Sequence, residues 1–199
     1  MPHAHHEIAQ TRSSLLRQRA QAFCAAFLDL PNNPPDKLLA EHFTPTNPQI
    51  TEHGPGWASK RLPFLGKTFA SKGECLEYFR LLAKTLEFIP HARTFPLSGE
   101  GFVVDDQACV PSGDDGGGGG GGGGGSGHHG GVGKGWDGRG VVSVVGQAKF
   151  RAVGTGREWE EEFCYRLSGF DEEGRIGHWE VWADPLSAWV AVGGEEGGG

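Results

Sequence analysis

The stretch Gly174-Arg175-Ile176-Gly177-His178-Trp179-Glu180-Val181-Trp182-Ala183-Asp184-Pro185-Leu186 contains a run of alternating side chains over residues 175–184. Because successive side chains of a strand point to opposite faces of its sheet, this run predicts a strand with two different faces. One face would carry Trp179, Val181 and Ala183. The other would carry His178, Glu180, Trp182 and Asp184. If the tryptophan face packs in the core, the ionisable face is solvated; if His178 and Glu180 point inward, they are buried ionisable groups, which is typical of a functional site.

The segments around this strand predict an α+β fold. Apolar residues spaced by three and four predict helices over 11–30 and 71–86, and prolines 34 and 35 begin a shorter helix that ends near residue 43. Period-two alternation predicts strands over the segments 49–53, 91–97, 101–110, 141–153, 159–167 and 175–184. Helices followed by a run of antiparallel strands predict three N-terminal helices packed on a curved, mostly antiparallel sheet of five to six strands.

Glycine divides the chain into one domain and three segments expected to be flexible. The sequence has 35 glycines among 199 residues, and many of them lie in an insertion at 113–140 and a tail at 192–199. Such segments cannot bury enough apolar surface to fold, and residues 1–10 are expected to be flexible as well. A single domain over 11–191, interrupted by the insertion, is therefore predicted. Replacing Asp114–Arg139 by a short turn is expected to preserve folding.

Charge and cysteine usage exclude several classes of function. The chain has 18 Lys and Arg against 25 Asp and Glu, with no basic cluster, which argues against binding to nucleic acid or to an anionic membrane. No apolar run approaches the roughly 20 residues of a spanning helix. Cys24, Cys75, Cys109 and Cys164 form no Cys-x-x-Cys pair, so buried free thiols are expected rather than disulfides or zinc ligands. We therefore expect a cytoplasmic protein.

Two motifs point to a family. A strand ending in Glu52-His53-Gly54-Pro55 and the closing stretch 174–186 resemble the SnoaL-like branch of the nuclear-transport-factor-2-like (NTF2-like) superfamily. In that branch a Gly-x-Ile and a His-Trp-(Asp/Glu) sequence commonly precede an Asp in the last strand. The resemblance covers residues 11–191 apart from the insertion and is closest to chains of filamentous fungi. It implies a cone, closed by helices and a curved sheet, that holds a small apolar molecule.

The resemblance also implies a chemistry. In enzymes of this superfamily one Asp, Glu or His moves a proton, while a Tyr, Asp or His stabilises an enolate. An apolar cavity raises the pKa of a carboxyl group and strengthens a hydrogen bond to a developing oxyanion. The same fold also occurs in non-catalytic subunits, so fold alone does not establish an activity.

Four residues are the candidates for catalysis. His53 precedes a loop expected at the mouth of the cone, and histidine exchanges protons near neutral pH; alternatively it caps the turn. His178, Glu180 and Asp184 share one strand face, where His178 could form a dyad with either carboxylate or belong to a surface ladder. Four further residues are candidates for substrate binding: Trp57, Tyr78, Tyr165 and Trp182. Of these, Trp57 could also pack in the core, and Tyr165 needs a partner for its hydroxyl on an otherwise apolar face.

The sequence therefore predicts a protein that binds a small apolar or polyketide-like molecule and acts on it by acid–base chemistry without a cofactor, as an isomerase, cyclase or dehydratase. The alternative is a non-catalytic ligand-binding or dimerisation module, and in either case we expect a homodimer formed through the sheet. No metal and no nucleotide is expected, because the glycine run lacks the Gly-x-x-x-x-Gly-Lys-Ser/Thr pattern. An open pocket that meets at least two of the named ionisable groups would favour the enzyme, whereas a cone filled by Trp, Phe and Leu, with no void near about 300 Å³, would exclude it.

Overall fold

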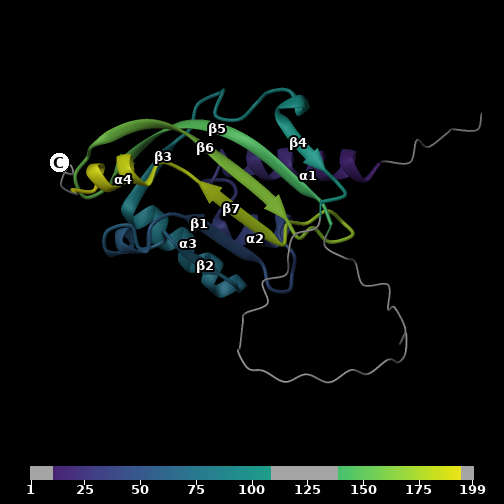
Figure 1. The fold of residues 1–199 in the computed structure, drawn as a ribbon, viewed down its shortest axis with the longest axis horizontal. Coiled ribbons are helices and arrows are strands. Elements are labelled where there is room, and N and C mark those ends of the chain that lie inside the picture. The colour runs from purple at the N-terminus through teal and green to yellow at the C-terminus, as the bar shows by residue number, and fades with distance from the viewer. Residues whose placement is uncertain (1–10, 109–138, 194–199) are drawn as a thin grey trace, which may run out of the picture.

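A computed structural model describes residues 11–108 and 139–193 of the chain (Figure 1). The helices of this part are α1 (Arg12–Phe27), α2 (Pro35–His42), α3 (Lys72–Thr85) and α4 (Pro185–Ala191), with short 3₁₀ helices η1 (Gly56–Lys60) and η2 (Gly99–Gly101). The strands are β1 (Gln49–His53), β2 (Lys67–Phe69), β3 (Leu86–Ile89), β4 (Phe102–Asp105), β5 (Val141–Ala152), β6 (Glu158–Ser168) and β7 (His178–Trp182). None of the described helices is long and apolar enough to cross a membrane.

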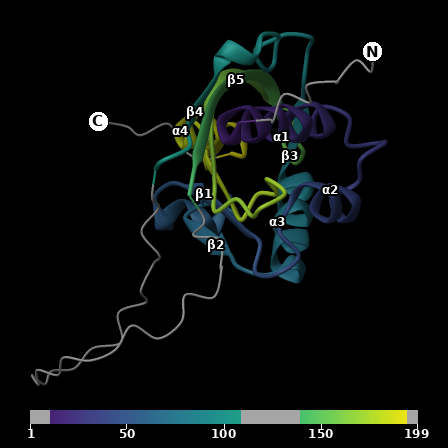
Figure 2. The ribbon, with the colours of Figure 1, turned by 90° about the vertical axis from the view of Figure 1, so that its right-hand side faces the viewer.

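The seven described strands form one mixed sheet. Its order is β2-β1-β7-β6-β5-β3, and β4 also pairs with β5. Only β1 and β7 run parallel among the described pairs, so the sheet is mostly antiparallel as expected. Figure 2 shows α1, α2 and α3 together on one side of the curved sheet, which makes that side the inner face of a cone. The predicted α+β class is confirmed.

The two longest helices begin and pack as their sequences predict. In α1 an apolar stripe is buried against the sheet: Leu16, Ala20, Phe23 and Phe27. At the start of α3, Ser71 Oγ accepts the amide of Glu74 at 3.1 Å. The reciprocal contact of a capping box is displaced by one residue, because Glu74 Oε2 accepts the amide of Ala70 at 2.6 Å.

Several predicted elements are wrong or shifted. The strand expected at 91–97 is absent; β3 precedes it at Leu86–Ile89, and the hydroxyl of Thr94 accepts the amide of His91 in a turn that follows Pro90. The strands expected at 101–110 and 175–184 shorten to Phe102–Asp105 and His178–Trp182. Strand β2 and helix α4 were not predicted. The helices are also not all N-terminal, because α3 follows β1 and β2, and α4 follows the sheet.

The Gly-rich insertion joins the ends of one antiparallel pair. Asp105 of β4 is the cross-strand partner of Val141 at the start of β5, and the amide of Gly140 donates to the carbonyl of Ala108. Most of the insertion, both expected flexible ends and Cys109 lie outside the described residues. Free thiols are found at Cys24, Cys75 and Cys164, and burial raises the pKa of Cys75 to about 12.

Candidate active site

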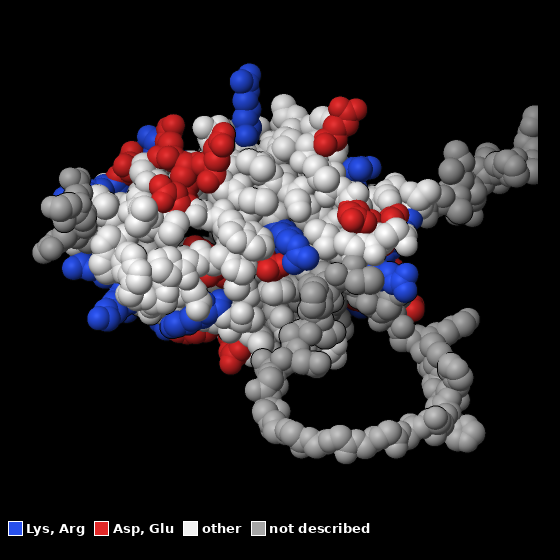
Figure 3. Space-filling model, in the orientation of Figure 1, with Lys and Arg blue, Asp and Glu red and all other residues white. Residues whose placement is uncertain are grey.

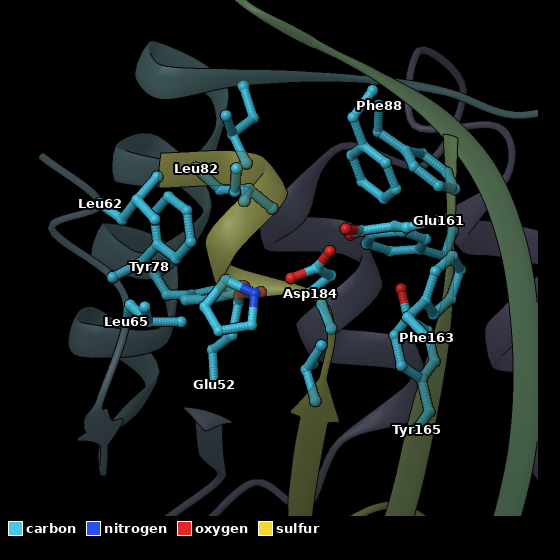
Figure 4. Close-up of a pocket in the computed structure, with 18 residues that line it drawn as sticks. Glu52, Leu62, Leu65, Tyr78, Leu82, Phe88, Glu161, Phe163, Tyr165 and Asp184 are labelled. Carbon is cyan, nitrogen blue, oxygen red and sulfur yellow. The ribbon is translucent and has the colours of Figure 1, made fainter. Parts of the chain in front are cut away.

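A cavity lies inside the cone, between the inner face of the sheet and the helices (Figure 4). Five phenylalanines supply much of its wall: Phe27, Phe64, Phe88, Phe150 and Phe163. Four leucines, Val181, two alanines and Pro185 supply further apolar wall, and the other lining residues are Glu52, Tyr78, Glu161, Tyr165 and Asp184. The space left free for water-sized atoms is about 50 Å³, below the roughly 300–1,000 Å³ of ordinary small-molecule pockets. The cavity therefore admits a compact molecule or one end of a larger one.

Glu52 is the deepest polar group of this cavity. Residues 50 and 52 of β1 are two positions apart, so their side chains point to the same face of the sheet. Because Ile50 packs in the core, Glu52 points inward as well. Its side chain is buried, and Oε2 accepts a hydrogen bond of 2.7 Å from the hydroxyl of Tyr78 on α3. Burial raises the pKa of Glu52 to about 7, against the lowering effect of the Tyr78 hydrogen bond. This carboxyl group can therefore give and take a proton near neutral pH.

Glu161 faces the same cavity from β6. Its Oε2 accepts a hydrogen bond of 3.0 Å from the indole Nε1 of Trp159, and the backbone of Asp184 provides a second hydrogen bond. Burial still raises the pKa of Glu161 to about 7. Figure 4 shows Glu52 and Tyr78 on one side of the cavity and Glu161 on the other, with Asp184 between them.

Tyr165 lines the cavity beside these carboxyl groups, and its hydroxyl has no hydrogen-bond partner among the described residues. The side chain as a whole is 4% exposed, and the hydroxyl is reached from the cavity. Burial raises its pKa well above the usual value, which keeps it protonated as a donor. A buried hydroxyl without a partner is uncommon in proteins, and a ligand oxygen in the cavity would satisfy it.

Asp184 lines the cavity and also begins α4. Its Oδ1 accepts the amides of Leu186 and Ser187, and its Oδ2 accepts the hydroxyl of Ser187 at 2.5 Å. The Ser187 hydrogen bond lowers the pKa of Asp184, so this carboxylate stays ionised. Helix α4 supplies Pro185 and Ala188 to the cavity wall.

The end of α4 is held by side chains from two loops. Thr155 Oγ1 donates to the carbonyl of Ala191 at 2.6 Å, and the guanidinium of Arg157 donates to the carbonyl of Val190 at 3.1 Å. From η1, the exposed Trp57 packs edge-on against Trp189, with ring centroids 4.9 Å apart. Trp57 therefore contacts the outside of α4, and neither lines the cavity nor belongs to the core.

The outer face of the sheet carries a separate ionic cluster. Glu180 is buried there between two partners: His53 Nε2 lies 3.1 Å from its Oε1, and Arg166 forms an ion pair with its Oε2. Trp182 stacks on the His53 ring with centroids 4.0 Å apart. On the same face His178 Nε2 lies 2.8 Å from the hydroxyl of Thr51, and burial lowers the pKa of His178.

The structure thus divides the residues proposed from the sequence between two faces. Trp179 is fully buried in the core, which turns His178, Glu180 and Trp182 outward. His53 lies with them on the outer face. Three of the proposed residues line the cavity instead: Tyr78, Tyr165 and Asp184.

Sequence reasoning missed Glu52 and Glu161. A signal existed for both, because Glu52 has the parity of Ile50 and Glu161 has the parity of Trp159 and Phe163. Of the four ionisable groups named from the sequence, the cavity meets only Asp184, and the cavity volume of about 50 Å³ is far below about 300 Å³. The condition set from the sequence for an enzyme acting through those four groups is therefore not met, and any acid–base chemistry in the cavity has to come from Glu52 and Glu161 instead. Within residues 11–108 and 139–193, no three His, Cys, Asp or Glu side chains lie close enough together to hold a metal ion.

Comparisons of sequence find no relative: no protein-family model and no curated protein matches the chain. Comparison of structures does find similar proteins. An NTF2-like protein of unknown function from Burkholderia pseudomallei matches with a TM-score of 0.53 at 17% identity, over 90% of this chain and 98% of the other.

Two further solved structures match over similar lengths. A protein provisionally assigned as a SnoaL-like polyketide cyclase, from Jannaschia sp. CCS1, has a TM-score of 0.51 at 11% identity and covers 94% of this chain and 100% of its own. The BvnE pinacolase of Penicillium brevicompactum has a TM-score of 0.51 at 15% identity, over 88% of this chain and 89% of the other. At these identities the likeness is one of fold.

Proposed function

The chain has the NTF2-like fold, and from the chemistry of its cone we propose that it is a cofactor-independent isomerase that moves a proton within a compact carbonyl compound. The observation that carries this proposal is Glu52, a buried carboxyl group with a pKa of about 7 at the wall of an apolar cavity. A general base is most effective when its pKa lies near the working pH. An isomerase needs one such group, because the proton that leaves one carbon returns to another.

The proton step follows from the hydrogen bonds of Glu52. Tyr78 occupies Oε2, whereas Oε1 has no hydrogen-bond partner among residues 11–108 and 139–193. In our proposal Oε1 takes the proton from the carbon next to the substrate carbonyl, and the electron pair of that C–H bond enters the enolate. In a β,γ-unsaturated carbonyl substrate, the protonated Glu52 then returns the proton to the γ-carbon, while the double bond shifts from the β,γ to the α,β position, so no atom is gained or lost.

Tyr165 can stabilise the negative charge of the enolate. Negative charge develops on the carbonyl oxygen as the proton leaves, and a preorganised donor in a dry cavity stabilises that charge strongly. The unpartnered hydroxyl of Tyr165 can donate to this oxygen without breaking an existing hydrogen bond. Its raised pKa keeps the proton on the tyrosine. We therefore assign proton transfer to Glu52 and oxyanion stabilisation to Tyr165, and place His53, His178 and Glu180 outside the reaction.

Hydrogen–deuterium exchange tests this assignment. Acetone is compact enough for the cavity, and its exchange in D₂O can be followed by NMR with the full chain present. We expect exchange above the buffer rate, and we expect Glu52→Gln to abolish the excess. Glu162→Gln is the matched control, because Glu162 is exposed on the outer face of β6 and should leave the rate unchanged. A rate equal to buffer, or an equal rate in Glu52→Gln, would contradict the proposal.

The outer face supports a second candidate, a homodimer formed through the sheet. Three of the large apolar side chains that the described part exposes lie on this face: Val103 (68%), Val145 (56%) and Trp182 (40%). Val145, Cys164 and Trp182 are successive cross-strand neighbours, so they form a row across the sheet. In Figure 3 acidic side chains gather beside this region, over the start of β6, where Glu158, Glu160 and Glu162 are exposed.

Sedimentation velocity separates the two candidates. A non-catalytic dimerisation module would sediment as a dimer that Val145→Glu dissociates, and it would show no acetone exchange. An enzyme that is also a dimer would retain exchange in the Val145→Glu variant, because Val145 lies on the face opposite the cavity.

A further inference from the structure

Glu161 faces the cavity and has no basic partner among the described residues. Two hydrogen-bond donors, the indole of Trp159 and the backbone of Asp184, point to its carboxylate. No Lys, Arg or His of the described chain pairs with it. A carboxyl group in an apolar wall avoids the cost of a buried charge either by staying protonated, as Glu161 does below its pKa of about 7, or by pairing with a cation once it is ionised. The geometry leaves that cation to be supplied from the cavity.

The other side chains of the cavity also favour a positively charged ligand. Its acidic lining groups are Glu52, Glu161 and Asp184, and no basic residue lines it. Five phenylalanines also line it, and the face of an aromatic ring attracts cations. Because the cavity is surrounded by apolar side chains, these interactions are stronger than on the surface. An anionic ligand would meet three carboxyl groups and no counter-charge.

We propose that the cavity binds a small nitrogen cation with N–H donors, a protonated amine or amidine, and that Glu161 is its anchor. The inference deepens the proposed function by naming the charge of the substrate, and it rests on that function only in taking the cone cavity as the site. Glu52 remains the proton-transfer group, and Glu161 becomes the residue that determines specificity. The hydroxyl of Tyr165 remains available to the carbonyl oxygen of the same molecule.

The cavity sets the size of the cationic group. A water needs roughly 10–15 Å³ of space measured in this way, so 50 Å³ accepts about four atoms of that size. Acetamidinium, acetamide and acetate form a suitable series of probes. They are planar, nearly equal in size, and differ mainly in carrying a positive, zero or negative charge.

The inference also implies a pH dependence with a defined sign. The titratable groups that face the cation are Glu161 and Asp184 on its anchor side, Glu52 and Tyr78 opposite, and Tyr165. Both tyrosines stay protonated and Asp184 stays ionised. Glu52 and Glu161 have pKa values of about 7, so they lose their protons as the pH rises from 6 to 8. Affinity for acetamidinium should therefore rise over this range, while that for acetamide should change little.

Calorimetric titration of the full chain at pH 8 tests the inference. Acetamidinium should bind more tightly than acetamide, and acetate most weakly. Glu161→Gln should weaken acetamidinium binding roughly 10- to 100-fold, as expected for loss of a charge-assisted hydrogen bond, and leave acetamide unaffected. Glu162→Gln, on the opposite face of the same strand, should change neither.

Three results would overturn the inference: equal affinity for acetamidinium and acetamide, no loss of acetamidinium affinity in Glu161→Gln, or no binding of acetamidinium to the folded chain. Trp159→Phe provides an independent measurement. Removal of its hydrogen bond should raise the pKa of Glu161 and move the rise in acetamidinium affinity to higher pH. If the protein binds acetamidinium but does not exchange acetone, the proposed isomerase is refuted and the cation site stands. If it exchanges acetone but does not discriminate acetamidinium from acetamide, the cation site is refuted and the proposed isomerase stands.

Discussion

Tyr78 of α3 donates a hydrogen bond of 2.7 Å to Glu52 of β1 inside the core. This contact joins a helix and a strand on the same side of the cavity, and it gives a buried carboxyl group one fixed partner. The hydrogen bond lowers the pKa of Glu52, but burial raises it more, to about 7. The balance of these two effects makes both the stability and the proposed activity depend on pH.

Glu52→Gln should stabilise the protein at high pH. The pKa of Glu52 is raised from 4.5 to about 7 in the folded state, so folding favours the protonated form. Its ionisation therefore costs stability as pH rises from about 4.5 to 7, up to about 3 kcal/mol above that range. Glutamine still accepts from Tyr78 and carries no charge. Urea unfolding should show the variant more stable than the parent at pH 8 and similar at pH 5; an equal difference at both would contradict this origin.

Tyr165→Phe should separate activity from stability. The hydroxyl has no partner in the described chain, so its removal breaks no hydrogen bond, and the free energy of unfolding should change by less than about 0.5 kcal/mol. Loss of an oxyanion donor typically lowers the rate by about 10²- to 10³-fold. Tyr78→Phe is the contrasting variant, because it removes a formed hydrogen bond and should raise the pKa of Glu52 further. Unfolding curves and acetone exchange measure the two effects.

His178→Ala should preserve acetone exchange, since His178 lies on the outer face against Thr51. The catalytic role considered for His178 from the sequence predicts the opposite result, a loss of ligand turnover or binding with little change in melting temperature. Retained exchange supports the cone site, whereas loss of exchange in a folded variant would return His178 to the reaction.

Glu180→Gln should lower stability without affecting exchange. Glu180 is 8% exposed and forms an ion pair with Arg166, so the substitution leaves a half-buried guanidinium without its counter-charge. The expected loss is about 1–3 kcal/mol, measured by urea unfolding at pH 7. The pair of Lys149 and Glu158 offers a control, because both side chains are over 40% exposed and Glu158→Gln should cost little.

Replacing residues 114–139 by a short turn should preserve the fold. Asp105 and Val141 are cross-strand partners, so the two strands that the insertion connects already lie side by side at that end. The closure entropy of a loop falls as the loop shortens, by about 0.6 kcal/mol for each halving. The melting temperature should therefore stay equal or rise slightly; an unfolded product would contradict the expectation.

Much of the fold could be predicted because periodicity is local. The longest strands, β5 and β6, lie within a residue of their expected bounds, and the resemblance to NTF2-like proteins is confirmed at the level of fold. The wrong predictions lie where the secondary structure depends on pairing with a distant strand. Residues 86–89 continue the apolar spacing of α3, yet they pair with β5 as β3. Such pairing depends on a strand more than 50 residues away, which no local window contains.

The site could be predicted only in part, because parity tells which residues share a face and not which face is inside. In β7 the burial of Trp179 shows which face is inside, and His178 and Glu180 therefore point outward. For β6 the alternation does include Glu161 among aromatic residues, but a charged residue at an inward position contradicts the usual pattern of an apolar face. Both missed carboxyl groups are violations of that pattern, and such violations are expected at functional sites.

Helix α4 is a short part of the cavity wall whose opening need not involve the rest of the domain. It contributes Pro185 and Ala188 to the wall, spans seven residues, and is held at its end by the side chains of Thr155 and Arg157. Short terminal elements open with far smaller free energies than the global unfolding transition. Exchange of the α4 amides with solvent should thus be faster than that of the central strands. The rate at which molecules enter and leave the cone would then be set by the fraying of one helix, while the rest of the domain stays folded.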